Sequence, residues 1–411
     1  MPRQIVIIGA GASGLMAAIA AASEGASVTI LEQNEKPGKK LLATGNGKCN
    51  LTNTDLDPGY YHSDDPEKAA AVLKMFTVKD TLRFFRNLGL RVFDRQGWVY
   101  PTTEQAASVL NLLLWEAERL GVHFKNREEV TAVYPDIKEG PWIIRTASWQ
   151  YRADAVILSC GSRASSVRGS SDTAIRMADA IGIPRHPFLP VLVPLRIKET
   201  AVSSWNGTRV HAAVTLLING SRAATETGEL QMTAYGLSGI PIFQLSRIAV
   251  PALYEDAAVQ VLLDFLPEMT SEEVEDEWRM RQANAPEKTN LQLLTGMIPE
   301  KIIPVVLSHA GLRAHDLPHL ADHAEGGPVD RLMVCLKKFP LTITGTAAYE
   351  QAQVCTGGIA LSALTETLEC RKYPGLYVSG EAVHVDGPCG GYNLQWAWSS
   401  GYTAGCAAAK R

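Results

Sequence analysis

Glycines at positions 9, 11 and 14 fit the pattern G-x-G-x-x-G, a spacing that suits contact between backbone and an anion. Gly9 would permit a tight turn, Gly11 would let the backbone approach a pyrophosphate, and Gly14 would let a helix pack closely on a strand. Glu32 stands where an acidic side chain accepts hydrogen bonds from ribose hydroxyls, and its charge would repel the extra phosphate of NADP. The segment predicts a dinucleotide site, with FAD and NAD both open at this point.

A basic loop follows at 36–53, with the sequence KPGKKLLATGNGKCNLTN. It carries four lysines, three glycines and no carboxylate. The glycines could lay backbone against a flat ring, the lysines could offset phosphate charge, and Asn50 or Thr52 could hydrogen-bond the polar edge of a heterocycle. The alternative is a solvated basic loop, because charge runs usually are solvated.

A second glycine-rich region lies near the C-terminus. Gly380 and Glu381 follow an apolar, strand-like run, and the segment 387–395 (GPCGGYNLQ) leads into a predicted helix. A helix that begins near Tyr392 would aim its positive end at the pyrimidine edge of a flavin, where charge develops when the ring accepts a hydride. A glycine hinge before a packing helix is the alternative.

Four side chains of this region are candidates for an acid, base or nucleophile: His384, Asp386, Cys389 and Tyr392. Polar residues in tight turns often serve only the backbone, so this alternative stands beside the catalytic one. No Ser-His-Asp order stands out, and the reaction chemistry would then fall to a cofactor. The sequence leaves the catalytic residue unassigned.

Metal and thiol chemistry are both disfavoured. Histidines at 309, 315, 319 and 323 have helical spacing, but Pro318 interrupts the helix that they would share and no cysteine is near, so no metal site is predicted. The seven cysteines are scattered and none forms C-x-x-C. Cys49 has no companion in its loop, which argues against a disulfide reductase. Trp396 and Trp398 lie two apart on the predicted helix, so core packing is expected for at least one of them.

The elements that must position these residues alternate between strand and helix. A strand at 5–8, a helix at 12–22 and a strand at 28–31 form one βαβ unit, which implies a parallel sheet covered by helices. The run 375–381 resembles a buried strand ending in a turn and completes this α/β unit late in the chain. Further elements are predicted as helices at 67–88, 103–120 and 172–181, a hairpin at 91–100, and strands at 130–133, 142–146 and 155–158.

The late return of the α/β pattern predicts an inserted domain. A chain of 411 residues exceeds the size at which one hydrophobic core normally keeps growing. We therefore predict one discontinuous dinucleotide-binding domain over 1–190 and 341–411. The inserted domain would span 191–340, strand-rich over 191–266 and helical over 267–340.

Composition limits the partners. The formal net charge of -4 gives no broad basic field, so nucleic acid is not expected as the main partner. The N-terminal apolar run of four residues is too short for a signal peptide, and no stretch approaches the ~20 apolar residues of a membrane span. We expect a cytoplasmic protein with a small-molecule substrate, and the oligomeric state stays open.

With these segments in view, the chain resembles the bacterial BaiN/RdsA-type NAD(P)/FAD-dependent flavoproteins, a family that includes aminoacetone oxidase-like members. The resemblance covers nearly the full length and implies FAD as the cofactor. It also implies a glutathione-reductase-like (Rossmann-type) FAD-binding domain interrupted by a β-barrel plus helices. The matching motifs are IVIIGAGASGL at 5–15, KPGKKLLATGNGKCNLTN at 36–53, YGLSGIP at 235–241, TGGI at 356–359 and GLYVSGEAVHVDGPCGGYNLQWA at 375–397.

The glycine segments and the resemblance together imply a set of FAD-binding residues spread along the chain. They are Gly9, Gly11, Ala12, Ser13, Gly14, Glu32, Gln33, Lys39, Lys40, Leu41, Gly45, Asn50, Leu51, Thr52, Val130, Cys160, Gly161, Gly380, Glu381, Gly391, Tyr392, Asn393 and Leu394.

Three functions follow as hypotheses. The preferred one is an NAD(P)H-dependent reductase of a small organic substrate, with hydride transfer through flavin N5. The second is an oxygen-dependent oxidase of a small amine or amino ketone, and the third is a redox-idle binding protein stabilised by flavin. Because the sequence holds only one G-x-G-x-x-G that follows a strand, a nicotinamide would dock transiently rather than occupy a Rossmann domain of its own.

Overall fold

The computed structural model describes residues 1–135, 141–199, 204–318 and 325–410. The chain divides into two compact units, one made of Met1–Pro190 with Tyr349–Arg411 and the other of Val191–Ala348. The second unit therefore extends past residue 340, because the strand β18 (Phe339–Thr346) pairs with its neighbours in the barrel described below.

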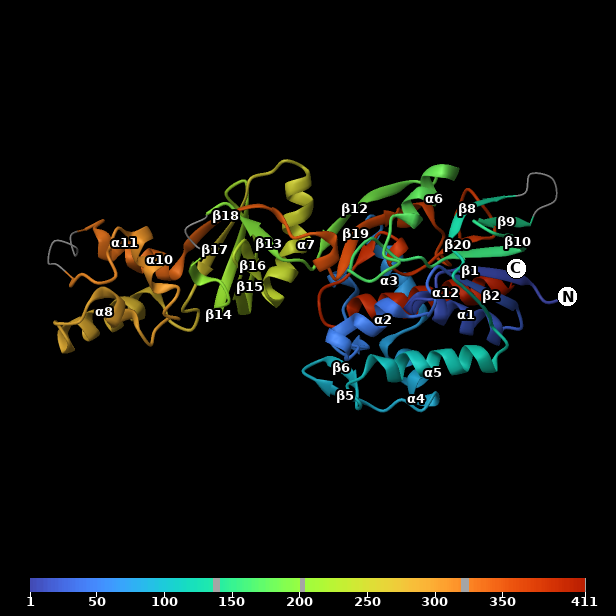
Figure 1. Cartoon of the computed structure of the whole chain (residues 1–411), viewed down its shortest axis with the longest axis horizontal. Helices are drawn as coiled ribbons and strands as arrows, with labels where there is room; N and C mark the ends of the chain where they lie inside the picture. Colours follow the sequence, from blue (N-terminus) through green and yellow to red (C-terminus); the bar gives the residue numbers. More distant parts are fainter. Residues whose placement is uncertain (136–140, 200–203, 319–324, 411) are drawn as a thin grey trace. The chain divides into compact units, whose positions relative to one another are not determined.

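A five-stranded parallel sheet forms the centre of the first unit (Figure 1). Apart from the largely exposed edge strand β7, its strands are short and mostly apolar, and β11 is buried along its whole length, as expected of a sheet covered on both faces. All of its pairs are parallel, so the carboxyl ends of the strands meet at one edge. In spatial order the strands are β20 (Leu376–Val378), β11 (Ala155–Leu158), β1 (Gln4–Ile8), β2 (Ser27–Glu32) and β7 (His123–Asn126).

Two helices from opposite ends of the chain pack against each other beside this sheet: α1 (Ala12–Ser23) and α12 (Tyr392–Lys410). Glycine on α12 makes the close approach possible. A Cβ atom at Gly401 would overlap the carbonyl oxygen of Ser13, and one at Gly405 would overlap that of Ala17. The N-terminal and C-terminal segments therefore share one core.

Around the sheet lie smaller elements that differ in one place from the sequence prediction. The single helix predicted at 67–88 is wrong, because one helix ends at Met75 and Thr77 caps the next in a reciprocal pair of hydrogen bonds with Asp80. The helices are α2 (Lys39–Ala43), α3 (Pro66–Met75), α4 (Val78–Asn87), α5 (Ala106–Arg119) and α6 (Thr173–Ile181). Two antiparallel sheets are formed, one by β3 (Thr52–Asn53), β6 (Trp98–Pro101) and β5 (Val92–Arg95), the other by β8 (Val130–Pro135), β9 (Trp142–Thr146) and β10 (Gln150–Ala153). Two further strand pairs are β4 (His62–Ser63) with β21 (Val385–Asp386) and β12 (Arg185–Val191) with β19 (Val354–Ile359).

The second unit contains a closed barrel, as the family resemblance implies. Its long hairpin of β14 and β15 alternates buried and exposed residues, which is the pattern of strands with one face toward a core. In spatial order the barrel strands are β13 (Leu195–Ile197), β16 (Gly236–Ser238), β15 (Ser221–Met232), β14 (Arg209–Ile218), β17 (Val259–Asp264) and β18. The helices of this unit are α7 (Ile240–Tyr254), α8 (Ser271–Asn284), α9 (Asn290–Leu294), α10 (Ile303–Ala310) and α11 (Pro328–Lys337).

Candidate functional site

The carboxyl edge of the parallel sheet holds the largest concentration of predicted site residues. The turns that follow three strands are tied together by backbone hydrogen bonds: Gly9 N donates to Leu31 O, Ser159 N to Ile8 O and Ser379 N to Leu158 O, each at 2.9 Å. Open α/β sheets bind their ligands outside this edge. A cavity of about 1170 Å³, part of it open to solvent, lies there.

The N-terminus of α1 opens into this cavity. Gly11 caps the helix without any side-chain hydrogen bond, and the first turn contains no acidic residue. A Cβ at Gly11 would meet nothing within 4 Å, whereas a Cβ at Gly14 would overlap the carbonyl oxygen of Gly9. Gly14 is thus required by the packing of helix on strand, while Gly11 leaves open space where an anion could meet the positive end of the helix.

Glu32 ends β2 and is buried beside this turn. One carboxylate oxygen accepts a hydrogen bond from Ala10 N at 2.9 Å, and the other accepts bonds from Asn34 N and Asn34 Nδ2, both at 2.8 Å. These donors hold the carboxylate in a fixed orientation. The neighbouring Gln33 donates to the carbonyl of Gly169 at 2.8 Å, which ties the loop after β11 to the same wall of the cavity.

Lys40 Nζ donates to Glu381 Oε2 at 2.5 Å. Both residues line the cavity, although they lie on distant segments of the chain. The second carboxylate oxygen of Glu381 is buried and has no hydrogen-bond partner. A buried acceptor of this kind calls for an additional donor, and a ligand can supply it. The pair therefore fits a polar ligand in the cavity.

The structure separates the predicted cofactor residues into two groups. The first group lines the cavity: Gly9, Gly11, Ala12, Ser13, Glu32, Gln33, Lys39, Lys40, Leu41, Val130, Cys160, Gly161, Glu381, Asn393 and Leu394. The second group lies outside the lining: Gly14, Gly45, Asn50, Leu51, Thr52, Gly380, Gly391 and Tyr392. Sequence reasoning missed other lining residues, among them Asn34, Thr44, Ser162, Arg168, Gly169, Gln353 and Val354.

Residues of the second group support the walls through hydrogen bonds. Thr52 Oγ1 donates to Gln395 Oε1 at 2.6 Å, which joins the basic loop to α12. Tyr392 donates to the carbonyl of Asp55 at 3.1 Å, and burial raises its pKa to about 12. Gly391 could not carry a side chain, because a Cβ there would lie 2.5 Å from the backbone of Thr52.

The two tryptophans of α12 are both core residues. Trp396 is buried and donates from Nε1 to the carbonyl of Gly380 at 3.0 Å, and Trp398 is buried and donates to the carbonyl of Leu51 at 2.9 Å. Each indole thereby fixes one of the segments that surround the cavity.

Two of the four catalytic candidates, His384 and Asp386, lie in a cluster of ionisable groups outside the cavity lining. Asp386 is buried and lies 3.3 Å from His62 Nδ1, which also lies 3.2 Å from Thr356 Oγ1. The ring of His384 packs 5.3 Å from that of His62, measured between centroids. Burial, with the nearby imidazoles of His186 and His62, lowers the pKa of His384 to about 4, so this imidazole is neutral at pH 7.

All seven cysteines lie within the described ranges, and none of them forms a disulfide there. Burial raises the pKa of Cys49 and of Cys160 to about 12, so both stay protonated at neutral pH. Cys389 is buried and its Sγ lies 3.8 Å from Oε1 of Gln353, a cavity-lining residue.

Comparison with known proteins identifies the family. The pattern described as "HI0933-like protein Rossmann domain" matches residues 3–407. The chain belongs to this HI0933-like family. The chain is 44% identical, over the full length of both, to the 3-dehydro-bile acid delta(4,6)-reductase of Clostridium scindens. It is 27% identical to the ribosomal RNA dihydrouridine synthase of Haemophilus influenzae, over 97% of this chain and 96% of the relative.

Solved structures agree on the fold. The 3-ketosteroid-delta4-(5alpha)-dehydrogenase of Rhodococcus jostii RHA1 superposes with a TM-score of 0.50 at 16% identity, covering 100% of this chain and 97% of that one. This HI0933-like protein is an FAD-dependent oxidoreductase. The predicted family, the predicted fold class and FAD as the cofactor are thereby confirmed, and the hypothesis of a redox-idle binding protein is set aside. Among the described helices, none combines the length and apolar character needed to cross a membrane. Of the four histidines weighed as metal ligands, those at 319 and 323 lie outside the described residues.

Proposed function

We propose that this HI0933-like protein reduces a carbon–carbon double bond conjugated with a carbonyl group, with NAD(P)H as the electron source. The supporting observation is the 44% identity over full length to a relative named as a delta(4,6)-reductase of a 3-dehydro-bile acid. We infer that the substrate is an unsaturated 3-oxo steroid acid or a compound of that class. In the net reaction NAD(P)H supplies the hydride equivalent that reaches one alkene carbon and solvent supplies a proton to the other, leaving NAD(P)+ and a saturated bond.

A second candidate substrate is uridine in RNA, and it belongs to the same chemical class. The C5–C6 double bond of uracil is conjugated with a carbonyl, and the relatives from Haemophilus influenzae and Escherichia coli are named ribosomal RNA dihydrouridine synthases. The identity to both is 27%, and the net charge of -4 offers no broad basic field for the RNA backbone. These two facts favour the small molecule over RNA as the proposed substrate.

The cavity residues suggest how FAD is held. We propose that the N-terminus of α1 and Gly11 receive the pyrophosphate, because this helix end has unfilled backbone donors and open space. Glu32 would accept from the ribose hydroxyls with its oriented carboxylate. Lys40 and Glu381 would meet the polar part of the cofactor nearer the ring, and bound FAD would supply the hydride-carrying group.

Anaerobic stopped-flow spectroscopy tests the electron source. Oxidised holoprotein is mixed with NADH, with NADPH and, in separate runs, with a small amine or amino ketone, while flavin absorbance is followed. Rapid bleaching by a nicotinamide supports the reductase. Rapid bleaching by the amine, followed by reoxidation with oxygen, would instead support the oxidase.

A second mixing step tests the acceptor. Holoprotein reduced by light is mixed without oxygen with an unsaturated 3-oxo steroid acid, with its saturated counterpart as the control, and with unmodified ribosomal RNA. Reoxidation by the unsaturated acid alone is the expected result, and the product should be two mass units heavier. Reoxidation by RNA alone would move the assignment to uridine, and reoxidation by neither would refute the proposed reaction.

A further inference from the structure

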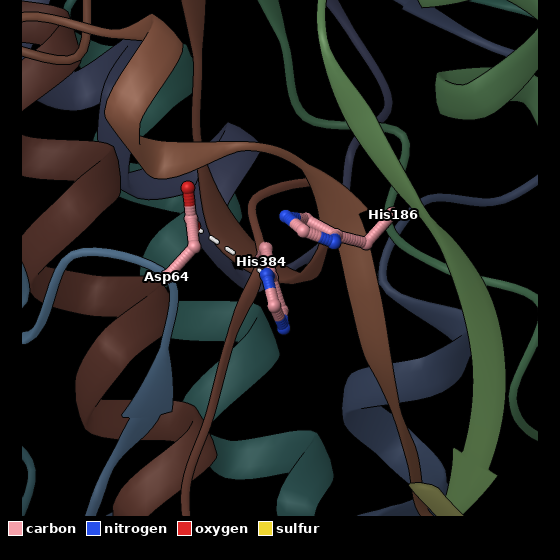
Figure 2. Close-up of side chains that lie close together, drawn as sticks. All are labelled: Asp64, His186 and His384. Carbon is pink, nitrogen blue, oxygen red and sulfur yellow. Dashed lines mark ion pairs between the residues drawn. The ribbon is translucent and has the colours of Figure 1, made fainter. Parts of the chain in front are cut away.

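Three metal-ligating side chains from distant parts of the sequence meet in the first unit. Figure 2 shows Asp64, His186 and His384 converging, with a dashed line marking the close contact between Asp64 and His384. Asp64 follows β4, His186 lies on β12 and His384 immediately precedes β21. One carboxylate oxygen and one nitrogen from each ring all lie within 4.8 Å of one another.

The carboxylate of Asp64 is held in place by the chain. Its oxygens accept hydrogen bonds from Leu361 N at 2.9 Å, Ser362 N at 3.1 Å and Ser362 Oγ at 2.6 Å. Metal-binding carboxylates are commonly oriented by such outer hydrogen bonds, which fix the ligand oxygen before the ion arrives. Asp64 therefore combines a fixed orientation with remaining lone pairs.

His384 supplies the second independent observation. Its side chain is more than nine-tenths buried, and its Nδ1 makes no hydrogen bond although it lies 3.4 Å from Asp64 Oδ1. A buried polar nitrogen without a hydrogen bond is rare and calls for a partner. The ring of His186 packs against it with centroids 4.3 Å apart, so a second imidazole borders the same point.

The donor set selects the kind of ligand. Two imidazole nitrogens and one carboxylate oxygen are ligands preferred by first-row transition metals and zinc, whereas Mg²⁺ and Ca²⁺ prefer oxygen alone. A carboxylate within the set disfavours an anion. None of the three residues lines the cavity proposed to hold FAD, so the cluster is separate from that proposed site.

We propose that Asp64, His186 and His384 bind a divalent transition-metal ion, with Zn²⁺ as the leading candidate and water completing the coordination. The sequence alone predicts no metal site, and none of these three residues belongs to the histidines at 309, 315, 319 and 323. A bound ion would join β4, β12 and the segment before β21, three pieces of chain that otherwise meet through side chains and short strand pairs.

Calorimetric titration of Zn²⁺ into holoprotein tests the proposal without any substrate. His186 is the best first position, because its side chain is exposed and His186→Ala should fold normally. The matched control is His123→Ala, which removes an exposed histidine from β7. We expect saturable one-site binding in the wild type and in His123→Ala, and Kd at least about tenfold higher in His186→Ala.

Co²⁺ binding gives an absorption spectrum that reports the ligands of the metal, which ion bound nonspecifically at the surface would not reproduce. A tetrahedral or five-coordinate N₂O site should give d–d absorption at wavelengths longer than the flavin bands, and this absorption should be lost in His186→Ala and in His384→Gln. If His384→Gln folds poorly, its melting curve will show it, and His186→Ala still decides. Equal Zn²⁺ affinity in wild type and His186→Ala, or the absence of saturable binding in the wild type, would overturn the proposal.

Discussion

Two glycines of the first turn should respond in opposite ways to the same small change. Gly11 and Gly14 lie three residues apart at the start of α1, and Ala at either adds one methyl group. At Gly14 the new Cβ would overlap the carbonyl oxygen of Gly9, whereas at Gly11 it would meet nothing within 4 Å. The structure therefore predicts a stability defect for one variant and a binding defect for the other.

For Gly14→Ala, helix and strand must separate. Forcing an extra methyl group into a packed core costs about 1–3 kcal/mol. For a domain of this size each kcal/mol lowers Tm by roughly 2–4 °C, so apoprotein should melt roughly 2–12 °C lower than the wild type. Thermal unfolding followed by circular dichroism measures this shift.

For Gly11→Ala, the apoprotein should melt within a few degrees of the wild type. The φ of -82° and ψ of -169° at Gly11 are open to any residue, and the loss of glycine at the N-cap is offset by a less flexible unfolded chain. In the holoprotein the methyl group would occupy the space proposed for the pyrophosphate. An overlap costing about 1–3 kcal/mol raises the Kd for FAD roughly 5- to 150-fold.

The measurement is FAD titration into apoprotein, followed by flavin fluorescence, for wild type and both variants. Unchanged FAD affinity in Gly11→Ala would refute the placement of the pyrophosphate. An unchanged melting temperature in Gly14→Ala would refute the packing argument. Because the two assays are independent, either part can fail alone.

Three further outcomes follow from the same structure. Cys49 and Cys160, with pKa values raised to about 12, should resist alkylation in native protein at pH 8 and react after unfolding in urea, as mass spectrometry can show. Lys40→Met should lower the melting temperature because it leaves the partly buried carboxylate of Glu381 without its cation, and adding Glu381→Gln should restore part of the loss in a double-mutant cycle. Gly405→Ala should destabilise the apoprotein by about 1–3 kcal/mol in urea, since its Cβ would overlap backbone of α1.

The parallel sheet and its first turn were predictable because their signals are local. The strand at 5–8, the helix from 12 and Glu32 follow one another within a single βαβ unit, and glycine spacing reports directly on backbone geometry. The barrel was accessible only through the family resemblance, because alternating strands predict a sheet but not its closure. The error over 67–88 has a different cause. The break between the two helices is marked by a local signal, the Thr77 cap, but the apolar pattern continues across it and predicts one helix.

The cavity itself required tertiary information. Gln353 and Val354 line it, yet neither follows a recognisable motif, and they reach it because β19 runs beside the turns at the sheet edge. The loop that contains Arg168 and Gly169 is likewise placed by its hydrogen bond to Gln33. Side chains whose role depends on a neighbouring segment carry no periodic signal in their own sequence.

The cluster of Asp64, His186 and His384 depends most strongly on tertiary structure, because no two of its members are neighbours in the sequence. Spacing rules find metal ligands when they lie on one helix or one loop, as the histidines at 309, 315, 319 and 323 would. Here each ligand comes from a different segment, and the register of β4 with β21 places residues 62–63 opposite 385–386. Asp64 and His384 flank that pair, so the fold brings together two ligands that the sequence keeps far apart. The strand pairing that builds the FAD domain thus also builds a second polar site, and saturable Zn²⁺ binding that depends on His186 is its expected signature.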